Sequence, residues 1–314
     1  MKILHITNNY PTSNHPIFGI FVKEQIDSLK NLNIESEVFF INGREKGKKE
    51  YFSSIKRLRK RIKNNDYDIL HCHHVFSAIL LLLVFKCYKA KKIISYQNPP
   101  KKEGGILLFF IIRFFFNAVI LKNTKLKSNK IFYLPNGVNL DFFKPHSCKE
   151  SINLLKLDKE KKYILFMDSY DKRKQKRVDR FDEVIEILLK NGNPYNIEPL
   201  KLTNVDRKLI PLYLSASSVH IITSDFEGSP NSVKESMACN TPVVSTPVGN
   251  IYDLIGDVDG CYIAKSFDSI ELARLTIKAL NNEDSNFRQI LIDKKYDAKS
   301  VSKDLKNIYK SIIS

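Results

Sequence analysis

The segment SDFEGSPNSVKESMACNTPVVSTPVG, residues 224–249, combines groups that could hold a nucleotide sugar. Ser229 is a preferred N-cap and Pro230 suits a first helical position, so the spacing predicts a helix that reaches Cys239 and ends at Asn240. The first backbone N–H groups of a helix lack partners within it and attract anions such as a diphosphate. Here those N–H groups belong to Asn231, Ser232 and Val233.

Two glutamates flank this predicted helix start. Glu235 lies one turn into the helix, where its carboxylate could accept hydrogen bonds from the vicinal hydroxyls of a ribose. Glu227 precedes the helix on a turn and could reach a different part of the same ligand. Gly228 has no Cβ and lets a ligand approach the backbone closely. A donor site is the functional interpretation, and a capped helix with no ligand is the structural alternative.

Histidines and cations form two further clusters. DILHCHH contains His71, His73 and His74, and residues 172–177 read KRKQKR. Alternating histidines of one strand without a nearby carboxylate do not predict a metal site, so no metal is expected. The cations could neutralise a diphosphate, or they could form a solvated basic loop.

The composition favours an ordinary two-domain globular protein. The chain has 314 residues, of which 43% are hydrophobic and 27% charged, and its net charge is +17. The five cysteines are scattered and form no Cys-x-x-Cys pair, so neither a disulfide framework nor a zinc site is expected. The N-terminal segment lacks the apolar stretch of a signal peptide, which predicts a cytoplasmic location.

Apolar and basic runs raise the question of a membrane. ILLFFIIRFFFNAVIL, residues 106–121, is too short and too interrupted to span a bilayer. We expect a buried helix followed by a buried strand, with a monotopic contact at a membrane surface as the alternative. The basic runs at 44–49 and 56–63 make an anionic membrane surface a candidate partner, at which the protein would be peripheral. Nucleic acid is not expected, because no aromatic-interleaved or zinc-finger pattern accompanies the charge.

Strands and helices alternate along the whole chain. Short apolar runs predict strands, and longer amphipathic segments between them predict helices, which together indicate parallel, doubly wound α/β sheets with ligands at the carboxyl ends of the strands. The expected strands are residues 2–7, 35–41, 67–73, 91–96, 117–121, a strand beginning near 131, 162–168, 219–223, 241–246 and 260–264. Clear helices are expected at 19–30, 53–63 and 178–190, with two or three more closing the chain.

The segment FEGSPNSVKESMACNTPVVSTPVGNI resembles the donor site of retaining glycosyltransferases of family 4, which have the GT-B fold. In that family a Glu, seven residues and a second Glu precede a small-residue helix and a Pro-Val-Val strand. Further segments resemble the family in the same order: NNYPTSNHPIFGIFVKEQIDSL its first loop and helix, DILHCHH its third strand, LPNGVNLDFFKP its domain crossing, KRVDRFDEVIEIL its lysine-bearing helix and VSKDLKNIYKSII its returning helix.

The resemblance implies an α/β architecture of two Rossmann-like, doubly wound domains that face a cleft. Residues 1–144 would form the acceptor-side domain and residues 145–295 the nucleotide-sugar domain. Residues 296–314 would form a helix that packs back on the first domain.

The resemblance also implies roles for individual residues. Glu235 would bind the donor ribose, and Glu227 would contact hydroxyls of the transferred sugar beside the backbone of residues 228–231. Lys176 would neutralise the diphosphate together with Arg173 or Arg177.

On the acceptor side, the resemblance implies that His73 faces the cleft, with His71 and His74 as alternatives. Gly19 would approach the donor phosphate or the acceptor. No metal and no cofactor are implied. The chain departs from the family pattern at Gln97 and Asn98, where the family often has His-Gly, and at DSYDKRKQ, which replaces a Gly-rich loop.

The sequence therefore predicts a retaining, metal-independent glycosyltransferase. It would move a hexose or hexosamine from a nucleoside diphosphate donor, expected to be UDP-linked, to a glycan or lipid-linked acceptor in capsule, O-antigen or similar cell-surface polysaccharide synthesis. The alternatives are a nucleotide-sugar 2-epimerase of the same fold and a non-catalytic basic binding protein. An NAD-dependent dehydrogenase is disfavoured, because no Gly-x-Gly-x-x-Gly follows the first strand.

Overall fold

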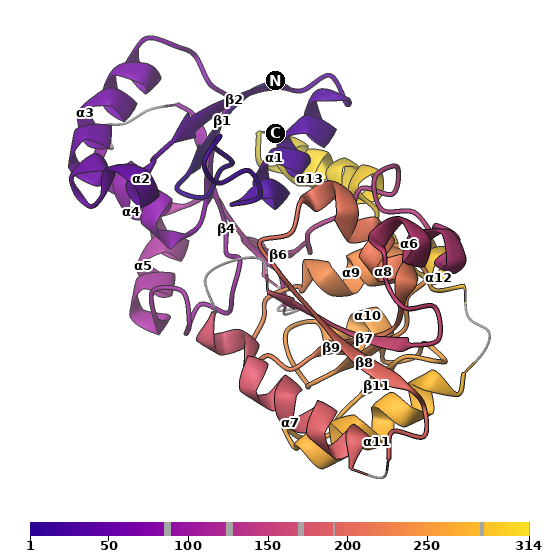
Figure 1. The fold of residues 1–314 in the computed structure, drawn as a ribbon. Helices are drawn as coiled ribbons and strands as arrows, with labels where there is room; N and C mark the ends of the chain where they lie inside the picture. The colour runs from indigo at the N-terminus through magenta and orange to yellow at the C-terminus, as the bar shows by residue number, and fades with distance from the viewer. Residues whose placement is uncertain (85–88, 124–127, 169–172, 191, 283–285, 314) are drawn as a thin grey trace. The chain divides into compact units, whose positions relative to one another are not determined.

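The computed structural model describes residues 1–84, 89–123, 128–168, 173–190, 192–282 and 286–313. The chain divides into two compact units (Figure 1). One unit comprises residues 1–137 together with 298–314, and the other comprises residues 138–297.

The first unit is built on a six-stranded parallel sheet with the strand order β2-β1-β3-β4-β5-β6. Every neighbouring pair is parallel, as expected for strands that are connected through helices. The strands are β1 (Lys2–Thr7), β2 (Glu35–Phe40), β3 (Ile69–His73), β4 (Lys91–Ser95), β5 (Ala118–Leu121) and β6 (Ile131–Tyr133).

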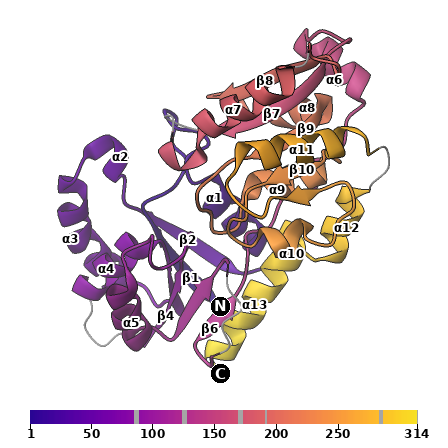
Figure 2. The ribbon, with the colours of Figure 1, turned by 90° about the horizontal axis from the view of Figure 1, so that it is seen from below.

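Helices cover both faces of this sheet (Figure 2). Helix α1 (Ile20–Lys30) and the C-terminal helix α13 (Ala298–Ile313) pack on one face, around alternate strand residues such as Ile3 and Ile69. The other face packs against α3 (Lys49–Lys63), α4 (Val75–Val84) and α5 (Ile106–Phe115), around the neighbouring residues Leu4 and Leu70. A short helix, α2 (Gly43–Lys46), precedes α3. Both faces of each central strand are therefore buried, which explains the continuous apolar runs.

The second unit contains a five-stranded parallel sheet with the order β11-β10-β9-β7-β8. Its strands are β7 (Lys162–Asp168), β8 (Ile197–Thr203), β9 (Ser217–Ile222), β10 (Val243–Ser245) and β11 (Tyr262–Ile263). Its helical elements are α6 (Cys148–Leu155), η1 (Lys174–Lys176), α7 (Val178–Leu189), η2 (Arg207–Leu209), α8 (Ile210–Ala216), α9 (Asn231–Ala238), α10 (Ile251–Ile255), α11 (Ser269–Leu280) and α12 (Phe287–Asp293). Apolar residues of α7 and α11 form one core layer, and α8, α9, α10 and α12 contribute to the other.

The prediction of doubly wound parallel sheets is thus confirmed in both units, but one expectation about burial is wrong. Strand β5 is buried, whereas in helix α5 only Phe109 and Ile112 are buried. A helix on a sheet buries only the stripe that faces the strands, and α5 has large apolar side chains on its outer face too. Among the described residues, no helix combines the length and apolar character that crossing a bilayer requires.

Candidate functional site

Helix α9 begins one residue later than the sequence predicts. Pro230 occupies the N-cap position with extended backbone angles, and Asn231 is the first helical residue. Ser229 does not cap the helix, because its hydroxyl instead accepts a hydrogen bond of 2.9 Å from Nζ of the buried Lys234. The predicted helix end is confirmed, since Asn240 has the left-handed φ of 60° that asparagine tolerates.

The first turn of α9 presents polar groups of two kinds. Its first backbone N–H groups have no acceptor within the helix, as in any α-helix. Asn231 Oδ1 and Ser232 Oγ are buried atoms without a hydrogen-bond partner among the described residues. Val233, the third residue of the turn, is fully buried and anchors the helix in the core. Buried polar atoms are nearly always hydrogen-bonded, so this turn is suited to a polar ligand.

The turn before α9 packs against a second turn, which follows β10. The carbonyl of Gly228 accepts a hydrogen bond of 3.1 Å from the backbone N–H of Asn250. Gly249 has φ 58°, and a Cβ there would lie 2.5 Å from the oxygen of Gly228. Only glycine fits at residue 249, so this second turn holds the backbone before α9 in place.

Glu227 and Lys176 form an ion pair beside this turn. Lys176 Nζ donates to Glu227 Oε1 at 2.6 Å, and the two side chains are 9% and 11% exposed. The hydroxyl of Ser224 donates to the same carboxylate oxygen at 2.9 Å. The structure therefore brings together two of the site residues that the sequence singled out, from positions 51 residues apart.

The backbone around Lys176 is tied to the end of β9. Thr223 Oγ1 donates a hydrogen bond of 2.7 Å to the carbonyl of Lys176. The backbone N–H of Asp225 donates to the carbonyl of Gln175 at 2.9 Å. These bonds hold η1 against the turn that carries Glu227, so the ion pair is positioned by the main chain as well as by its own charges.

Burial and charge act in opposite directions on Glu227. Burial by itself would raise the pKa of the Glu227 carboxyl, because it disfavours the charged form. The ammonium of Lys176, the hydroxyl of Ser224 and the charge of Arg173 outweigh burial, and the pKa of Glu227 is lowered. Glu227 is thus an acceptor of hydrogen bonds at neutral pH and does not serve as a proton donor.

The two predicted arginine partners are placed differently from each other. The guanidinium of Arg177 binds Asp179 at 2.7 Å and Asp225 at 3.0 Å, and both partners raise its pKa. Arg173 is 40% exposed, and its Nε lies 3.2 Å from the buried Asp168 at the end of β7. The charge of Arg173 also contributes to the lowered pKa of Glu227. The segment DSYDKRKQ lies partly outside the described residues.

Glu235 has a partner that the sequence reasoning missed. Arg207 NH1 lies 3.6 Å from Glu235 Oε1, and the two side chains are 18% and 13% exposed. The Arg207 guanidinium also lies over the rings of Phe142 and Phe143, at 5.3 and 5.0 Å from their centroids. Arg207 follows β8, a strand that was not among the expected ones, so no predicted element marked this residue as lying at the carboxyl end of the sheet.

His73 lies in the interior of the first unit. It is 1% exposed, its Nε2 lies 3.0 Å from His5 Nδ1, and its ring stacks on His71 with centroids 4.2 Å apart. Burial, His5 and Lys122 hold the pKa of His73 well below its usual range. His74, the other alternative, keeps 18% exposure and lies 3.7 Å from Glu103.

His5, His71 and His73 are close enough together to ligate a metal, since one nitrogen from each lies within 4.8 Å of the others. The ring nitrogens are nevertheless largely engaged. His71 Nδ1 bonds Tyr309 Oη at 2.6 Å and its Nε2 bonds Ser95 Oγ at 2.9 Å. A metal would have to replace these bonds in a fully buried site, so the arrangement fits a hydrogen-bonded core cluster better.

Gly19 is required by the backbone around it. It has φ 68° at the N-cap of α1, and a Cβ would lie 2.3 Å from the backbone of Asn9 and 2.6 Å from Tyr10 N.

Gln97 and Asn98 form part of another ordered turn, because Glu103 Oε2 accepts a 2.8 Å hydrogen bond from the backbone N–H of each. The structure thus places Gly19 and His73 in the first unit and the remaining predicted site residues in the second.

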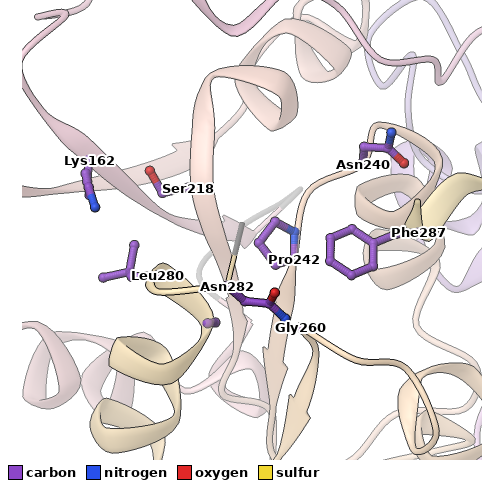
Figure 3. A pocket seen from close by; sticks show the side chains of 9 residues that line it. Lys162, Ser218, Asn240, Pro242, Gly260, Leu280, Asn282 and Phe287 are labelled. Carbon is purple, nitrogen blue, oxygen red and sulfur yellow. The ribbon is translucent and has the colours of Figure 1, made fainter. Parts of the chain in front are cut away.

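A cavity of about 250 Å³ lies at the opposite end of the second sheet (Figure 3). Lys162 begins β7, Ser218 lies at the start of β9, and Pro242 and Gly260 precede β10 and β11. These residues mark the amino ends of the strands, whereas Glu227 and Glu235 follow the carboxyl end of β9. The cavity is therefore not part of the candidate site.

Two family models match the chain. The model described as "Glycosyl transferases group 1" matches residues 199–298, and "Glycosyl transferase 4-like" matches residues 20–100. An uncharacterized 41.2 kDa protein in the cps region of Klebsiella pneumoniae is 24% identical over 63% of this chain, and a probable sucrose-phosphate synthase of Thermosipho melanesiensis is 27% identical over 48%. The matched segments span 65% and 40% of those relatives, less than two thirds of either.

Solved structures are similar over nearly the whole chain. Sucrose-phosphate synthase from Thermosynechococcus elongatus has a TM-score of 0.77 at 12% identity, with 99% of each chain covered. Anabaena HepE in complex with UDP and glucose has a TM-score of 0.72 at 13% identity, with 99% of this chain and 100% of that chain covered. A glycosyltransferase from Rickettsia africae has a TM-score of 0.70 at 16% identity, with 100% and 99% covered. These similarities identify the fold as GT-B-like.

Proposed function

Since this chain belongs to the group 1, family 4-like glycosyltransferases, a retaining family, we propose that it transfers a sugar from a UDP-linked donor to a glycan or lipid-linked acceptor. The observation that carries the proposal is the group of side chains around the start of α9. Glu227, a helix N-terminus with unpartnered polar atoms, and Glu235 follow the carboxyl end of β9, and Lys176, the ion-pair partner of Glu227, follows the carboxyl end of the neighbouring β7. Parallel α/β sheets bind nucleotides at this end.

In the proposed complex the diphosphate lies at the start of α9. Its charge would meet the N–H groups of Asn231, Ser232 and Val233, where the helix dipole favours anions. The unpartnered Asn231 Oδ1 and Ser232 Oγ could bond a hydroxyl of the same ligand. Glu235 would accept hydrogen bonds from the ribose hydroxyls, with Arg207 holding its carboxylate in place.

The transferred sugar would lie beside the Lys176–Glu227 pair. Glu227 is ionised and would accept hydrogen bonds from sugar hydroxyls, while Gly228, Ser229 and Pro230 bring the backbone close. When the glycosidic bond breaks, negative charge grows on the departing UDP, and fixed cations lower the free energy of that transition state. Lys176 and Arg173 are the proposed cations, so we propose that no metal ion is required.

Retention of anomeric configuration requires the acceptor hydroxyl to attack the face from which UDP leaves. In this proposal a donor phosphate oxygen takes the hydroxyl proton, and the protein contributes position and charge. Gly19 and His73 belong to the first unit and are proposed for the acceptor side. His73 would act from the interior, by orienting the end of β3, because it is almost completely buried.

The capsule-region relative and the HepE complexes support the finer parts of the proposal. The Klebsiella relative lies in a cps region, which favours an acceptor in capsule or another cell-surface polysaccharide. The HepE structures contain UDP, and one contains UDP-glucose, which favours a UDP-linked donor here. A lipid-linked acceptor would be met at a membrane, so an anionic membrane surface is part of the proposal.

Calorimetric titration with UDP, GDP and ADP tests the donor site. We expect micromolar binding of UDP, weakened by about 1.5–3 kcal/mol, roughly 10- to 150-fold, in Glu235→Ala, because a hydrogen bond to a charged group is lost. The matched control is Glu186→Ala, an exposed glutamate on α7 whose removal should leave the affinity unchanged.

Three other outcomes have distinct meanings. If no nucleotide binds, the proposed donor site is wrong. Turnover of a UDP-sugar to a new epimer without any acceptor would indicate a 2-epimerase. Salt-sensitive binding of DNA that is indifferent to Glu235→Ala would indicate a basic binding protein without this activity.

A further inference from the structure

Helix α5 carries an exposed apolar face that the fold does not require. Phe109 and Ile112 pack into the core beneath the helix. On the opposite side, six large apolar residues remain 41–77% exposed: Ile106, Leu107, Phe110, Ile111, Phe114 and Phe115. Their spacing forms two adjacent rows, with steps of four residues in each, so they line one continuous face of the helix. We call these six residues the α5 face.

A basic stripe lies on the same side of the sheet. The inner residues of α3 and α5 pack into one core cluster with α4 between them, so their outer faces both point away from the strands (Figures 1 and 2). On α3, Lys56, Arg59, Lys60 and Lys63 are exposed and make no ion pair with any described residue. Phe52, at the start of this stripe, is 75% exposed.

Apolar side chains also connect the two helices. Phe76 and Leu83 on α4 are 52% and 60% exposed. The turn before α5 adds the exposed Lys101 and Lys102. The outer layer of the first unit is therefore a surface of large apolar side chains edged by cations, in a protein of net charge +17.

We propose that the α5 face is a membrane-docking surface that inserts into the headgroup region of an anionic bilayer. The basic stripe of α3, which comprises Lys56, Arg59, Lys60 and Lys63, would bind the lipid phosphates. A ten-residue helix is about 15 Å long, too short to span a bilayer but sufficient to lie in its interface. Apolar insertion and cation attraction act together in such binding, and each cation near an anionic surface adds to the affinity. A second copy of the chain would not be attracted to this surface, because its own stripe carries the same charge.

This inference deepens the proposed function and rests on it in one respect, since a lipid-linked acceptor would be met at the same surface. The docking itself requires no donor, no acceptor and no residue of α9. Its failure can therefore be distinguished from failure of the donor site, which nucleotide titration measures separately.

The test is co-sedimentation of the full-length protein with vesicles, without nucleotide. We expect binding to vesicles of phosphatidylglycerol and phosphatidylcholine, at least tenfold stronger than to phosphatidylcholine alone. Leu107→Ser combined with Phe114→Ser should weaken it at least tenfold. The matched control is Phe267→Ser with Ile270→Ser, two exposed apolar residues of the second unit, for which we expect less than a twofold change.

The charge contribution has its own matched pair. Lys56→Gln combined with Lys60→Gln should weaken binding to the anionic vesicles about tenfold, with little effect on neutral ones. Lys303→Gln with Lys310→Gln removes the same charge from α13, on the opposite face of the sheet, and should have less than a twofold effect. Each of the four double variants alters exposed side chains only, so its melting temperature should match that of the parent protein.

Three results would overturn the proposal. The first is equal, variant-independent binding to both vesicle types, and the second is no binding to either. The third is a concentration-dependent dimer in analytical ultracentrifugation that Leu107→Ser with Phe114→Ser dissociates while vesicle binding is unaffected. The α5 face would then be covered by a second copy of the chain.

Discussion

Replacing Lys176 by Met tests whether the buried ion pair with Glu227 exists in solution. Both side chains are about nine-tenths buried, and without Lys176 the carboxylate would still accept the hydrogen bond from the hydroxyl of Ser224, a neutral donor. Removing one partner of a buried pair leaves an uncompensated charge and costs about 3–5 kcal/mol. We expect a loss of that size in the free energy of unfolding of the second unit at pH 7.

The loss should depend on pH in a defined direction. In the parent protein the folded-state pKa of Glu227 is lowered, so its contribution to stability is present above the ordinary pKa of about 4.3 and is lost only as pH falls through the lower folded value. Without Lys176, burial is opposed only by the Ser224 hydroxyl and the charge of Arg173, and we expect the folded-state pKa of Glu227 to rise above the ordinary one. As the pH falls from 7 to about 5, Glu227 in the variant becomes protonated and no longer carries a buried charge. The difference in the free energy of unfolding between the parent protein and the variant should therefore decrease.

Urea unfolding followed by circular dichroism measures these changes. The control is Lys174→Met, which removes the same charge from an exposed position on the same turn and should change stability by less than about 0.5 kcal/mol. The double variant Lys176→Met with Glu227→Gln should be about 1–3 kcal/mol more stable than the sum of the single losses predicts. If Lys176→Met behaves like Lys174→Met at pH 7 and shows no pH dependence, the ion pair and the lowered pKa of Glu227 are refuted.

Two predictions concern the first unit. Gly19→Ala should cost at least about 3 kcal/mol in unfolding experiments, since left-handed strain of about 1–2 kcal/mol adds to a backbone clash. Gly47→Ala, at φ 71° and ψ −171° with open space around its Cβ, should cost about 1–3 kcal/mol of backbone strain without a clash. A larger loss there than for Gly19→Ala would contradict the close approach at residue 19. Tyr309→Phe should lose about 1–3 kcal/mol, because His71 Nδ1 is left buried without its 2.6 Å partner. The exposed Tyr252→Phe should be neutral, and a neutral Tyr309→Phe would show that this bond does not hold α13 to the sheet.

Much of the fold could be predicted from local patterns. The bounds of β1 and β7 agree with the apolar runs at 2–7 and 162–168, because strands buried on both faces consist mostly of apolar residues. The alternation of strands and helices was sufficient to predict parallel sheets. The end of α9 could also be predicted, since asparagine tolerates the left-handed conformation that terminates a helix.

Predictions at the start of α9 and along α5 were less successful, and both errors concern tertiary partners. Ser229 is a good N-cap by local preference, but the buried amine of Lys234 takes its hydroxyl, and the helix begins at Asn231. Segment 106–115 is apolar enough to be a buried helix, but no described element covers its outer face. Local sequence shows how apolar a helix is and cannot show how many of its sides are covered.

The sequence by itself determined which chemical groups the protein possesses. These are one glutamate on a turn before a helix, a second glutamate within that helix, a basic run, and histidines on one strand. Only the tertiary structure decided which of them meet. Glu227 pairs with a lysine 51 residues away, and His71 bonds Tyr309 across 238 residues. Arg207 follows β8 and Glu235 follows β9, and the two side chains lie 3.6 Å apart because both strands pair with β7 in the same sheet. Periodicity and capping act within a few residues of the chain, whereas the pairing of charges depends on strand order and register, which bring distant segments to the same end of a sheet.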